Sequence, residues 1–231
     1  MENITSVSAN PDGRWLHRVG ASSALVIGIS YIVILPLFAR VGVPPIGGEI
    51  WLKYLQGKTT IWWTILALCV LTDFLFVPLA LSLYIALHQV SRSAMLLATA
   101  LVGLFVGLDL AVTWTNYASL LSLSGSYAAA TNDVQRVGYI AAANYASAVL
   151  ASHAQVFYSI VDLAFAIFII GFVMLKANGI FSKTTAYLGL AAGLFGILSA
   201  TGFFVTVMLH TILLTVWIFF VGHGLFRFSQ K

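Results

Sequence analysis

The sequence predicts an all-α, polytopic membrane protein built as a bundle of six transmembrane helices, and three observations support that prediction. The 231-residue chain is 61% hydrophobic and only 8% charged, and its mean hydropathy of +1.00 is far too high for a soluble domain. Its apolar runs reach the roughly 20 residues that a helix needs to cross a bilayer. Only helices and closed barrels satisfy their backbone polar groups in lipid, so runs of this length indicate helices.

Six apolar runs are separated by polar or turn-forming segments. They lie at 21–40, 62–88, 94–122, 154–175, 185–204 and 208–227. The last two are the least clearly divided, because no charge separates them and only the stretch from Gly202 to His210 offers a turn. The chain therefore divides into a cytoplasmic N-terminal tail (1–20), a six-helix transmembrane domain (21–228) and a C-terminal tail (229–231).

Two connections on the outer side are longer than a turn requires. The first contains EIWLKYL at 49–55, a short amphipathic segment that we expect on the membrane surface. The second offers Asn132 as an N-cap, with Gln135 three residues on, before an Ala-rich outer helix that leads into the fourth span. Tryptophans near the span ends predict interfacial anchors, with Trp15 at the inner edge and Trp51, Trp62 and Trp63 at the outer edge.

The basic residues predict the orientation of the chain. With the amino terminus inside, seven Lys or Arg face the cytoplasm and four face outward. The positive-inside rule then places both termini in the cytoplasm, as an even number of spans requires. The inner set is Arg14, Arg18, Arg92, Lys176, Lys183, Arg227 and Lys231, and the outer set is Arg40, Lys53, Lys58 and Arg136.

Three aspartates, Asp73, Asp109 and Asp162, interrupt the apolar runs. Counted along their helices, they lie about 17, 20 and 12 Å from the outer ends of three successive spans, so they could share one cavity. No Lys or Arg lies within any span at that depth. Because an ionised carboxylate without a partner costs several kcal/mol in hydrocarbon, we expect at least one aspartate to hold a proton at neutral pH.

Polar residues near the aspartates predict either a wet path or a set of internal hydrogen bonds. The residues that could line such a path are Thr72, Thr113, Asn116, Tyr158 and Ser159. Under the functional interpretation, the three acids bind a proton or cation jointly. Under the structural interpretation, they are permanently neutral acids that are hydrogen-bonded inside the bundle. The sequence leaves both interpretations open.

Four histidines near the two faces are the candidates for haem ligation: His88 and His223 on the inner side, and His153 and His210 on the outer side. His210 and His223 are thirteen residues apart, about 20 Å along a helix, which would suit two stacked haems. Their partners would have to come from different helices, and interfacial histidines are common, so we expect no haem b and no metal site.

Known enzyme signatures are missing from the sequence, which has no HExxH, GxSxG, Walker or CxxC motif. This favours a non-enzymatic protein. The basic residues are scattered at span edges without the cluster that nucleic acid would need, so we exclude nucleic acid as a partner. Two small-residue ridges, Gly103 with Gly107 and Ala111, and Gly189 with Gly193, predict close contacts within the bundle, with a membrane protein partner or with a second copy.

Three segments of the C-terminal half resemble a known group of proteins. They are YAAATNDVQRVGYIAAANYASAVLASHAQVFYSIVDLAF, GFVMLKANGIFSKTTAYLGLAAGLFGILS and VWIFFVGHGLFRF. They resemble a family of bacterial and archaeal multi-pass membrane proteins catalogued as a domain of unknown function. The resemblance implies six helices and a plasma-membrane location, and it carries over no functional residues.

The function that we predict from these features is that of a non-enzymatic transporter or sensor, in the lipid bilayer, whose intramembrane aspartates respond to a proton, a cation or a small solute. One alternative is an assembly or interaction subunit of a membrane complex with permanently neutral aspartates. A b-type haem redox protein is the third.

Overall fold

The computed structural model describes residues 11–177, 179 and 181–230, and these residues form an all-α protein. Within that part of the chain, six helical stretches are long and apolar enough to cross a membrane. They are Arg14–Val41, Thr59–Leu87, Arg92–Ala129, His153–Lys176, Lys183–Thr201 and Phe204–Ser229. The predicted fold class, a six-helix membrane bundle, is confirmed.

Two of the six spans are interrupted by π-helical turns. The third span consists of α4 (Arg92–Leu108), the π-helix η1 (Asp109–Trp114) and α5 (Thr115–Ala129), and the fourth of α7 (His153–Val156), the π-helix η2 (Phe157–Val161) and α8 (Asp162–Lys176). The other spans are α1 (Pro11–Val41), α3 (Thr59–Leu87), α9 (Lys183–Leu198) with the 3₁₀ turn η3 (Ser199–Thr201), and α10 (Phe204–Ser229). Two further helices, α2 (Gly48–Tyr54) and α6 (Asp133–Leu150), lie between spans.

The six spans pack in a closed ring. α1 packs against α3 and α10, α3 against α4, α4 against α8, and α9 between α8 and α10. Buried apolar side chains from all six spans, including Leu79, Phe105, Ile167 and Ile218, form one continuous core between them. The ring fixes which spans can share a site, because α3 and α4 are direct neighbours and α4 also meets α8.

Small residues allow the closest contact in this ring, where α8 meets α9. A Cβ atom on Gly193 would lie 2.6 Å from the Cβ of Phe168, and Gly189 is similarly enclosed. The predicted close contact is therefore confirmed for Gly189 and Gly193. Gly103 and Gly107 are exposed on α4, where an added Cβ would meet nothing within 4 Å. Contact of that ridge with another protein or a second copy stays a prediction.

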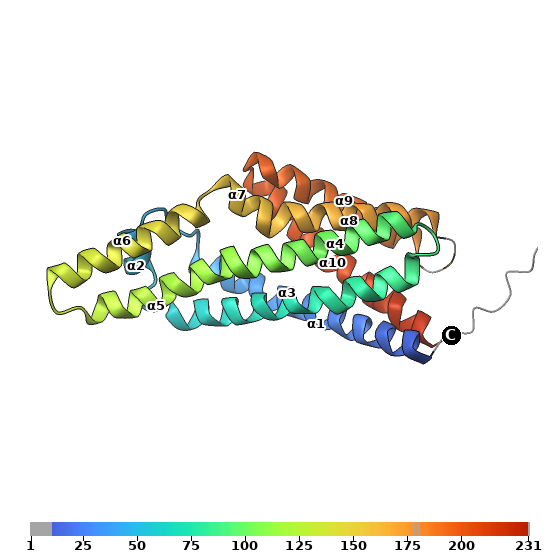
Figure 1. Ribbon diagram of the computed structural model, residues 1–231, viewed down its shortest axis with the longest axis horizontal. Helices are drawn as coiled ribbons and strands as arrows, with labels where there is room; N and C mark the ends of the chain where they lie inside the picture. Colours follow the sequence, from blue (N-terminus) through green and yellow to red (C-terminus); the bar gives the residue numbers. More distant parts are fainter. Residues whose placement is uncertain (1–10, 178, 180, 231) are drawn as a thin grey trace, which may run out of the picture.

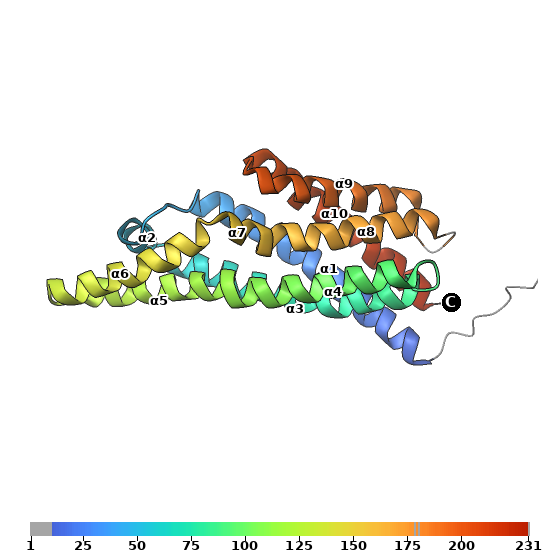
Figure 2. The ribbon, with the colours of Figure 1, turned by 45° about the horizontal axis from the view of Figure 1, so that its top comes forward.

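One part of the molecule extends beyond the ring. The rod formed by α4, η1 and α5 is 38 residues long. At 1.5 Å per residue it measures about 57 Å, whereas the hydrocarbon core of a bilayer is about 30 Å thick. α6 folds back along α5, and α2 packs against both helices (Figures 1 and 2). We refer to α2, α5, α6 and the first turns of α3 as the distal lobe.

The distal lobe has an apolar core of its own. Trp51, Leu52, Trp62 and Leu120 are each at most 2% exposed, and the rings of Trp62 and Tyr117 stack with centroids 5.2 Å apart. This contradicts the sequence-based expectation that Trp51 and Trp62 anchor the interface. By contrast, Trp15 and Trp63 are 66% and 42% exposed, as an anchor requires.

The EIWLKYL segment, which could lie on the membrane surface, packs one of its faces against protein, and its place relative to the membrane stays a prediction. It forms α2, which packs between α5 and α6, and the backbone N–H of Gly48 donates to Asn144 Oδ1 at 2.7 Å. A Cβ on Gly48 would lie 2.4 Å from the backbone nitrogen of Asn144, so only glycine allows this approach. The physical reason is that the third span continues to Ala129 instead of ending near residue 122, which provides protein surface that α2 can cover.

Two local features of the chain follow the sequence closely. Asn132 caps α6 by accepting a bond of 2.9 Å from the backbone N–H of Gln135, as predicted. The turn between the last two spans lies at Gly202, with φ of 78°, so α10 begins at Phe204, four residues before the expected 208.

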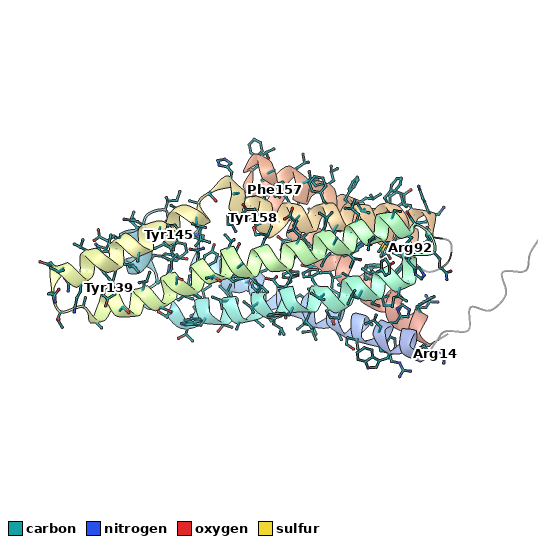
Figure 3. All side chains as sticks on the ribbon, in the orientation of Figure 1. Arg14, Arg92, Tyr139, Tyr145, Phe157 and Tyr158 are labelled. Atoms are coloured by element: carbon teal, nitrogen blue, oxygen red, sulfur yellow. The ribbon has the colours of Figure 1, made fainter. Side chains whose placement is uncertain are left out.

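The start of α1 and the end of α10 lie at the same end of the molecule (Figure 1). Arg14 and Arg92 mark that end, and Tyr139 and Tyr145 of α6 lie towards the opposite end (Figure 3). The same end carries six of the described basic residues: Arg14, Arg18, Arg92, Lys176, Lys183 and Arg227. Lys231 lies outside the described residues. We refer to this end as the basic end.

Candidate functional site

A pair of buried carboxyl groups lies where α3 meets the third span. Asp73 belongs to α3 and Asp109 is the first residue of η1, and each is 3% exposed. Their side chains lie within hydrogen-bonding reach of each other. An ionised carboxylate only accepts hydrogen bonds, so a bond between two carboxyl groups requires one of them to hold a proton. The arrangement suits two acids that share one proton.

Trp114 connects the pair to the rest of the third span. Its indole Nε1–H donates to Asp73 Oδ2 at 2.8 Å. Trp114 is five residues after Asp109, and in an α-helix that spacing would turn the two side chains about 140° apart. Hydrogen bonds in a π-helix run between residues i and i+5, so the η1 turn brings Trp114 back over Asp109. The π turn therefore assembles this part of the site.

Side chains bond the irregular backbone of η1. The backbone N–H of Thr115 bonds to the carbonyl of Val112. Its hydroxyl donates to the carbonyl of Leu110 at 2.8 Å, and the side-chain amide of Asn116 donates to the carbonyl of Val112 at 2.6 Å. Asn116, predicted to line a polar path, thus uses its side-chain N–H on its own helix.

A third polar contact leads from the pair towards the fourth span. The Thr113 side chain, 2% exposed, lies against the Asp109 carboxyl group. The Gln155 Nε2 atom lies 3.5 Å from Thr113 Oγ1 and 3.1 Å from Ser159 Oγ. Gln155 and Ser159 are both half-buried, and η1 and η2 are in contact along this line. Thr113 and Ser159 therefore lie on a polar seam between the two π-helical turns, and the role predicted for them, the lining of a polar path, stays a prediction.

Residues from α1 and α3 complete the surroundings of the pair. Tyr31 of α1 is near both carboxyl groups, and its hydroxyl contacts Thr72. The Thr72 hydroxyl itself donates to the carbonyl of Cys69 at 2.8 Å. Thr72, predicted as a lining residue, is buried and contacts the pair through Tyr31 instead of bonding it directly.

Asp162 is separate from the pair. It is the first residue of α8 and is 3% exposed, yet its Oδ2 has no hydrogen-bond partner among the described residues. Asp73 and Asp109 act on each other, whereas Asp162 is not among the charged neighbours of either. Tyr158 lies in η2, one turn before Asp162, in the segment that joins α6 to α8 (Figure 3). The structure thus brings together two of the three predicted acids.

The histidines have no common centre in the structure. His210 is buried, and its Nδ1 lies 2.8 Å from the carbonyl oxygen of Ala192, so this nitrogen carries the proton. His88 makes the same kind of bond to the carbonyl of Ile85, and His153 and His223 are exposed. Among the described residues, no group of three or more His, Cys, Asp or Glu could hold a metal ion. The expectation that the protein binds no haem stays a prediction.

Sequence reasoning missed three residues of this site: Tyr31, Trp114 and Gln155. Trp114 could not be placed beside Asp109, because five residues is not the spacing of one α-helical face. Tyr31 and Gln155 come from other spans, and their contacts depend on how the ring closes. The signal in the sequence was the interval of five residues between the aspartate and the tryptophan of DLAVTW. It indicates that the two side chains meet only if this stretch is known to be π-helical.

The fold and the site together define a multi-pass integral membrane protein with a buried pair of acids between its spans. Comparison with known proteins adds no closer assignment: no family model matches the chain, and searches of the curated proteins and of the solved structures find no match. The resemblance of the C-terminal half to an uncharacterised membrane family stays a prediction.

Proposed function

We propose that this membrane protein is a small transporter or sensor that responds to a proton or cation at the Asp73–Asp109 pair. The observation that supports this proposal is the pair itself: two buried acids in contact, with no Lys or Arg paired to either within the described residues. Such groups are costly in a membrane, and they are functional candidates by default. Because the two acids are in contact, a proton that binds to the pair changes the charge beside both helices that carry them, α3 and the third span.

The alternative is an assembly subunit in which both acids stay permanently neutral. It shares the fold and the buried carboxyl groups, and it differs in one measurable respect. A functional pair must change protonation or ligand state under accessible conditions, whereas a structural pair keeps its protons throughout.

Infrared titration of the purified protein in lipid nanodiscs tests the proposal. The carboxylic C=O band of the wild type should change with pH, and the midpoint of that change should shift in Asp73→Asn and in Asp109→Asn, because each variant leaves one carboxyl group without its partner. Asp133→Asn is the matched control, because this substitution makes the same chemical change at an exposed position in α6. If the carboxylic C=O band stayed constant over the whole accessible pH range, the assembly subunit would be the better-supported hypothesis.

We also propose that the basic end faces the cytoplasm and that the protein resides in the plasma membrane. Six basic residues at the basic end support this orientation by the positive-inside rule. The native Cys69 is buried, so an engineered cysteine reports its own position. A membrane-impermeant maleimide should label Val134→Cys in intact cells and Ser93→Cys only after permeabilisation. Labelling of Ser93→Cys from outside would reverse the orientation.

A further inference from the structure

The surroundings of the acid pair differ in polarity from one direction to the next. Towards the basic end, Phe76 lies one turn from Asp73 and Phe105 one turn from Asp109. Their rings meet edge to face with centroids 5.8 Å apart, and both side chains are at most 3% exposed. Val102 and Leu79 are buried next to them in the same core. These apolar side chains separate the pair from the basic end.

Directly towards the distal lobe, aromatic rings fill the space. The rings of Trp114 and Tyr117 lie 5.6 Å apart, and Tyr117 stacks on Trp62 at 5.2 Å. Trp51 packs on both Tyr117 and Trp62 from α2. This aromatic cluster closes the direct line from the pair into the distal lobe.

The remaining direction is the polar seam between η1 and η2, defined by Thr113, Gln155 and Ser159. Thr113 is buried beside Asp109, and Gln155 and Ser159 are half-buried at the distal end of the fourth span. A hydroxyl can both accept and donate a hydrogen bond, and an amide carries two donors and one acceptor oxygen. Gln155 Nε2 lies within reach of both hydroxyls, 3.5 Å from Thr113 Oγ1 and 3.1 Å from Ser159 Oγ, and of these three residues Gln155 is the nearest to the distal end of its span.

One oxygen of Asp109 accepts no hydrogen bond from an N–H or hydroxyl group of the described residues. Asp109 Oδ1 is buried and has no hydrogen-bond partner among the described residues, whereas Asp73 Oδ2 already accepts from Trp114. A metal cation would need several oxygen ligands around it, and the indole N–H that points at Asp73 opposes a positive ion there. A proton needs only one free lone pair, which Asp109 provides.

We propose that the ligand of the Asp73–Asp109 pair is a proton and that it reaches Asp109 from the distal side through the seam of Thr113, Gln155 and Ser159. This inference rests on the function proposed above and adds the ligand and its route. The proton comes from bulk water at the half-buried Gln155 and ends on a carboxylate oxygen of the pair. Water molecules held by the hydroxyls of Thr113 and Ser159 and by the Gln155 amide relay the proton. The amide keeps its N–H bonds and only positions the water, so only O–H bonds form and break.

The other titratable groups near the pair leave its charge unopposed. Tyr31 of α1, Cys69 of α3 and Tyr117 of α5 face the pair, and none of these carries a positive charge. From the fourth span, His153 is exposed and Asp162 does not act on the pair. His210 of α10 is hydrogen-bonded to the carbonyl of Ala192. The proton affinity of the pair is therefore set mainly by the two acids themselves.

Hydrogen–deuterium exchange of the carboxylic acid measures access to the pair. The protein in lipid nanodiscs is transferred to D₂O, and the rate at which its C=O band shifts is recorded by infrared spectroscopy. Gln155→Leu and Thr113→Val should each slow exchange about tenfold, the kinetic equivalent of losing one bridging hydrogen bond. The pH titration midpoint of Gln155→Leu should match that of the wild type, because Gln155 does not touch either carboxyl group. Thr113→Val also removes a hydroxyl that contacts Asp109, so its midpoint is expected to shift and only its exchange rate is compared.

Matched controls make the same chemical changes elsewhere. Gln56→Leu alters an exposed glutamine in the turn before α3, and Thr64→Val alters an exposed threonine whose hydroxyl bonds only to its own helix. Ser82→Ala removes a buried hydroxyl on the basic side, where it bonds to His17 at 3.1 Å. All three should exchange at the wild-type rate. Gln155→Met, which preserves the length of the side chain, replaces Gln155→Leu if that variant fails to fold.

The results of these measurements distinguish a failure of the proposed route from a failure of the proposed function. Wild-type exchange in both Thr113→Val and Gln155→Leu, or slower exchange in Ser82→Ala alone, would overturn the route while the titrating pair remained. A titration midpoint that moved with Na⁺ or K⁺ at constant pH would overturn the proton as ligand. If the titration midpoint of Asp109→Asn matched that of the wild type, the proposed function itself would fail.

Discussion

The Asp73–Asp109 pair and the solitary Asp162 are equally buried, each residue being 3% exposed, but their surroundings differ. Asp73 accepts the Trp114 indole N–H, and the two paired carboxyl groups lie against each other. Asp162 has an oxygen without a partner and no charged neighbour among the described residues. A solitary acid in such a place is adequately stable as a neutral group, whereas two acids in contact must divide protons between them. Burial alone therefore does not mark the functional acid.

The two π-helical turns beside these acids also differ in the hydrogen bonds that their side chains make. η1 begins at Asp109, and the side chains of Thr115 and Asn116 bond to its backbone carbonyls. η2 ends immediately before Asp162, and its Ser159 hydroxyl accepts from Gln155. π turns often lie at functional sites. The turn at the pair is supported by side chains that bond its backbone carbonyls, whereas the bond between Gln155 and Ser159 joins two side chains of the fourth span.

The largest expected difference between the two regions is in titration. Asp109→Asn should shift the midpoint of the pH-dependent change in the carboxylic C=O band, because Asp73 then titrates without a second acid beside it. Asp162→Asn should leave that change intact. Infrared titration of both variants in nanodiscs measures it. A shifted midpoint in Asp162→Asn would mean that the three acids form one set, as the sequence first suggested.

A second difference concerns stability. Asp73→Leu leaves the buried indole N–H of Trp114 without its acceptor, so we expect a loss of about 1 to 3 kcal/mol in the free energy of unfolding. Asp162→Leu removes an oxygen that already lacks a partner and should change stability little, or increase it. Unfolding in mixed micelles by denaturing detergent compares the two. Equal losses in both variants would show that Asp162 has a partner of equal importance.

A smaller effect isolates the indole hydrogen bond. Trp114→Phe preserves a large aromatic ring and removes the donor to Asp73, which should cost about 0.5 to 1.5 kcal/mol. Trp217→Phe is the matched control, because the buried Trp217 Nε1 has no hydrogen-bond partner among the described residues. The same unfolding measurement applies. A control that lost as much stability as Trp114→Phe would assign the effect to ring packing.

The sequence predicted the class of fold because hydropathy and span length depend on local composition. It also predicted Asn132 as a cap and Gly202 as part of the last turn, since both are local signals. It misplaced the buried Trp51, because the distal lobe forms only when the third span continues past the length that a bilayer requires. The sequence alone does not distinguish an exposed tryptophan at the membrane interface from one that is buried in the distal lobe.

The site was predictable only in part for the same reason. An aspartate in an apolar run is visible in any sequence, so Asp73, Asp109 and Asp162 were all found. Which of them meet depends on the order of helices in the ring, and the α3–α4 contact decides it. The role of Trp114 depends on a π turn, for which the sequence has no periodic signal.

The smallest expected effect concerns that π turn, and it tests whether the pair depends on it. Thr115→Val removes the hydroxyl that bonds the Leu110 carbonyl, so we expect a loss of about 0.5 to 1 kcal/mol in the free energy of unfolding. Thr211→Val is the control, because the Thr211 hydroxyl bonds the carbonyl of Val207, four residues earlier in the regular helix α10. There the carbonyl is already bonded within the helix, so the control should lose less. If η1 relaxes towards an α-helix in Thr115→Val, Trp114 turns away from Asp109, and combining this change with Trp114→Phe should cost less than the sum of the two. Full additivity in that double-mutant cycle would show that the indole bond to Asp73 does not require the π turn.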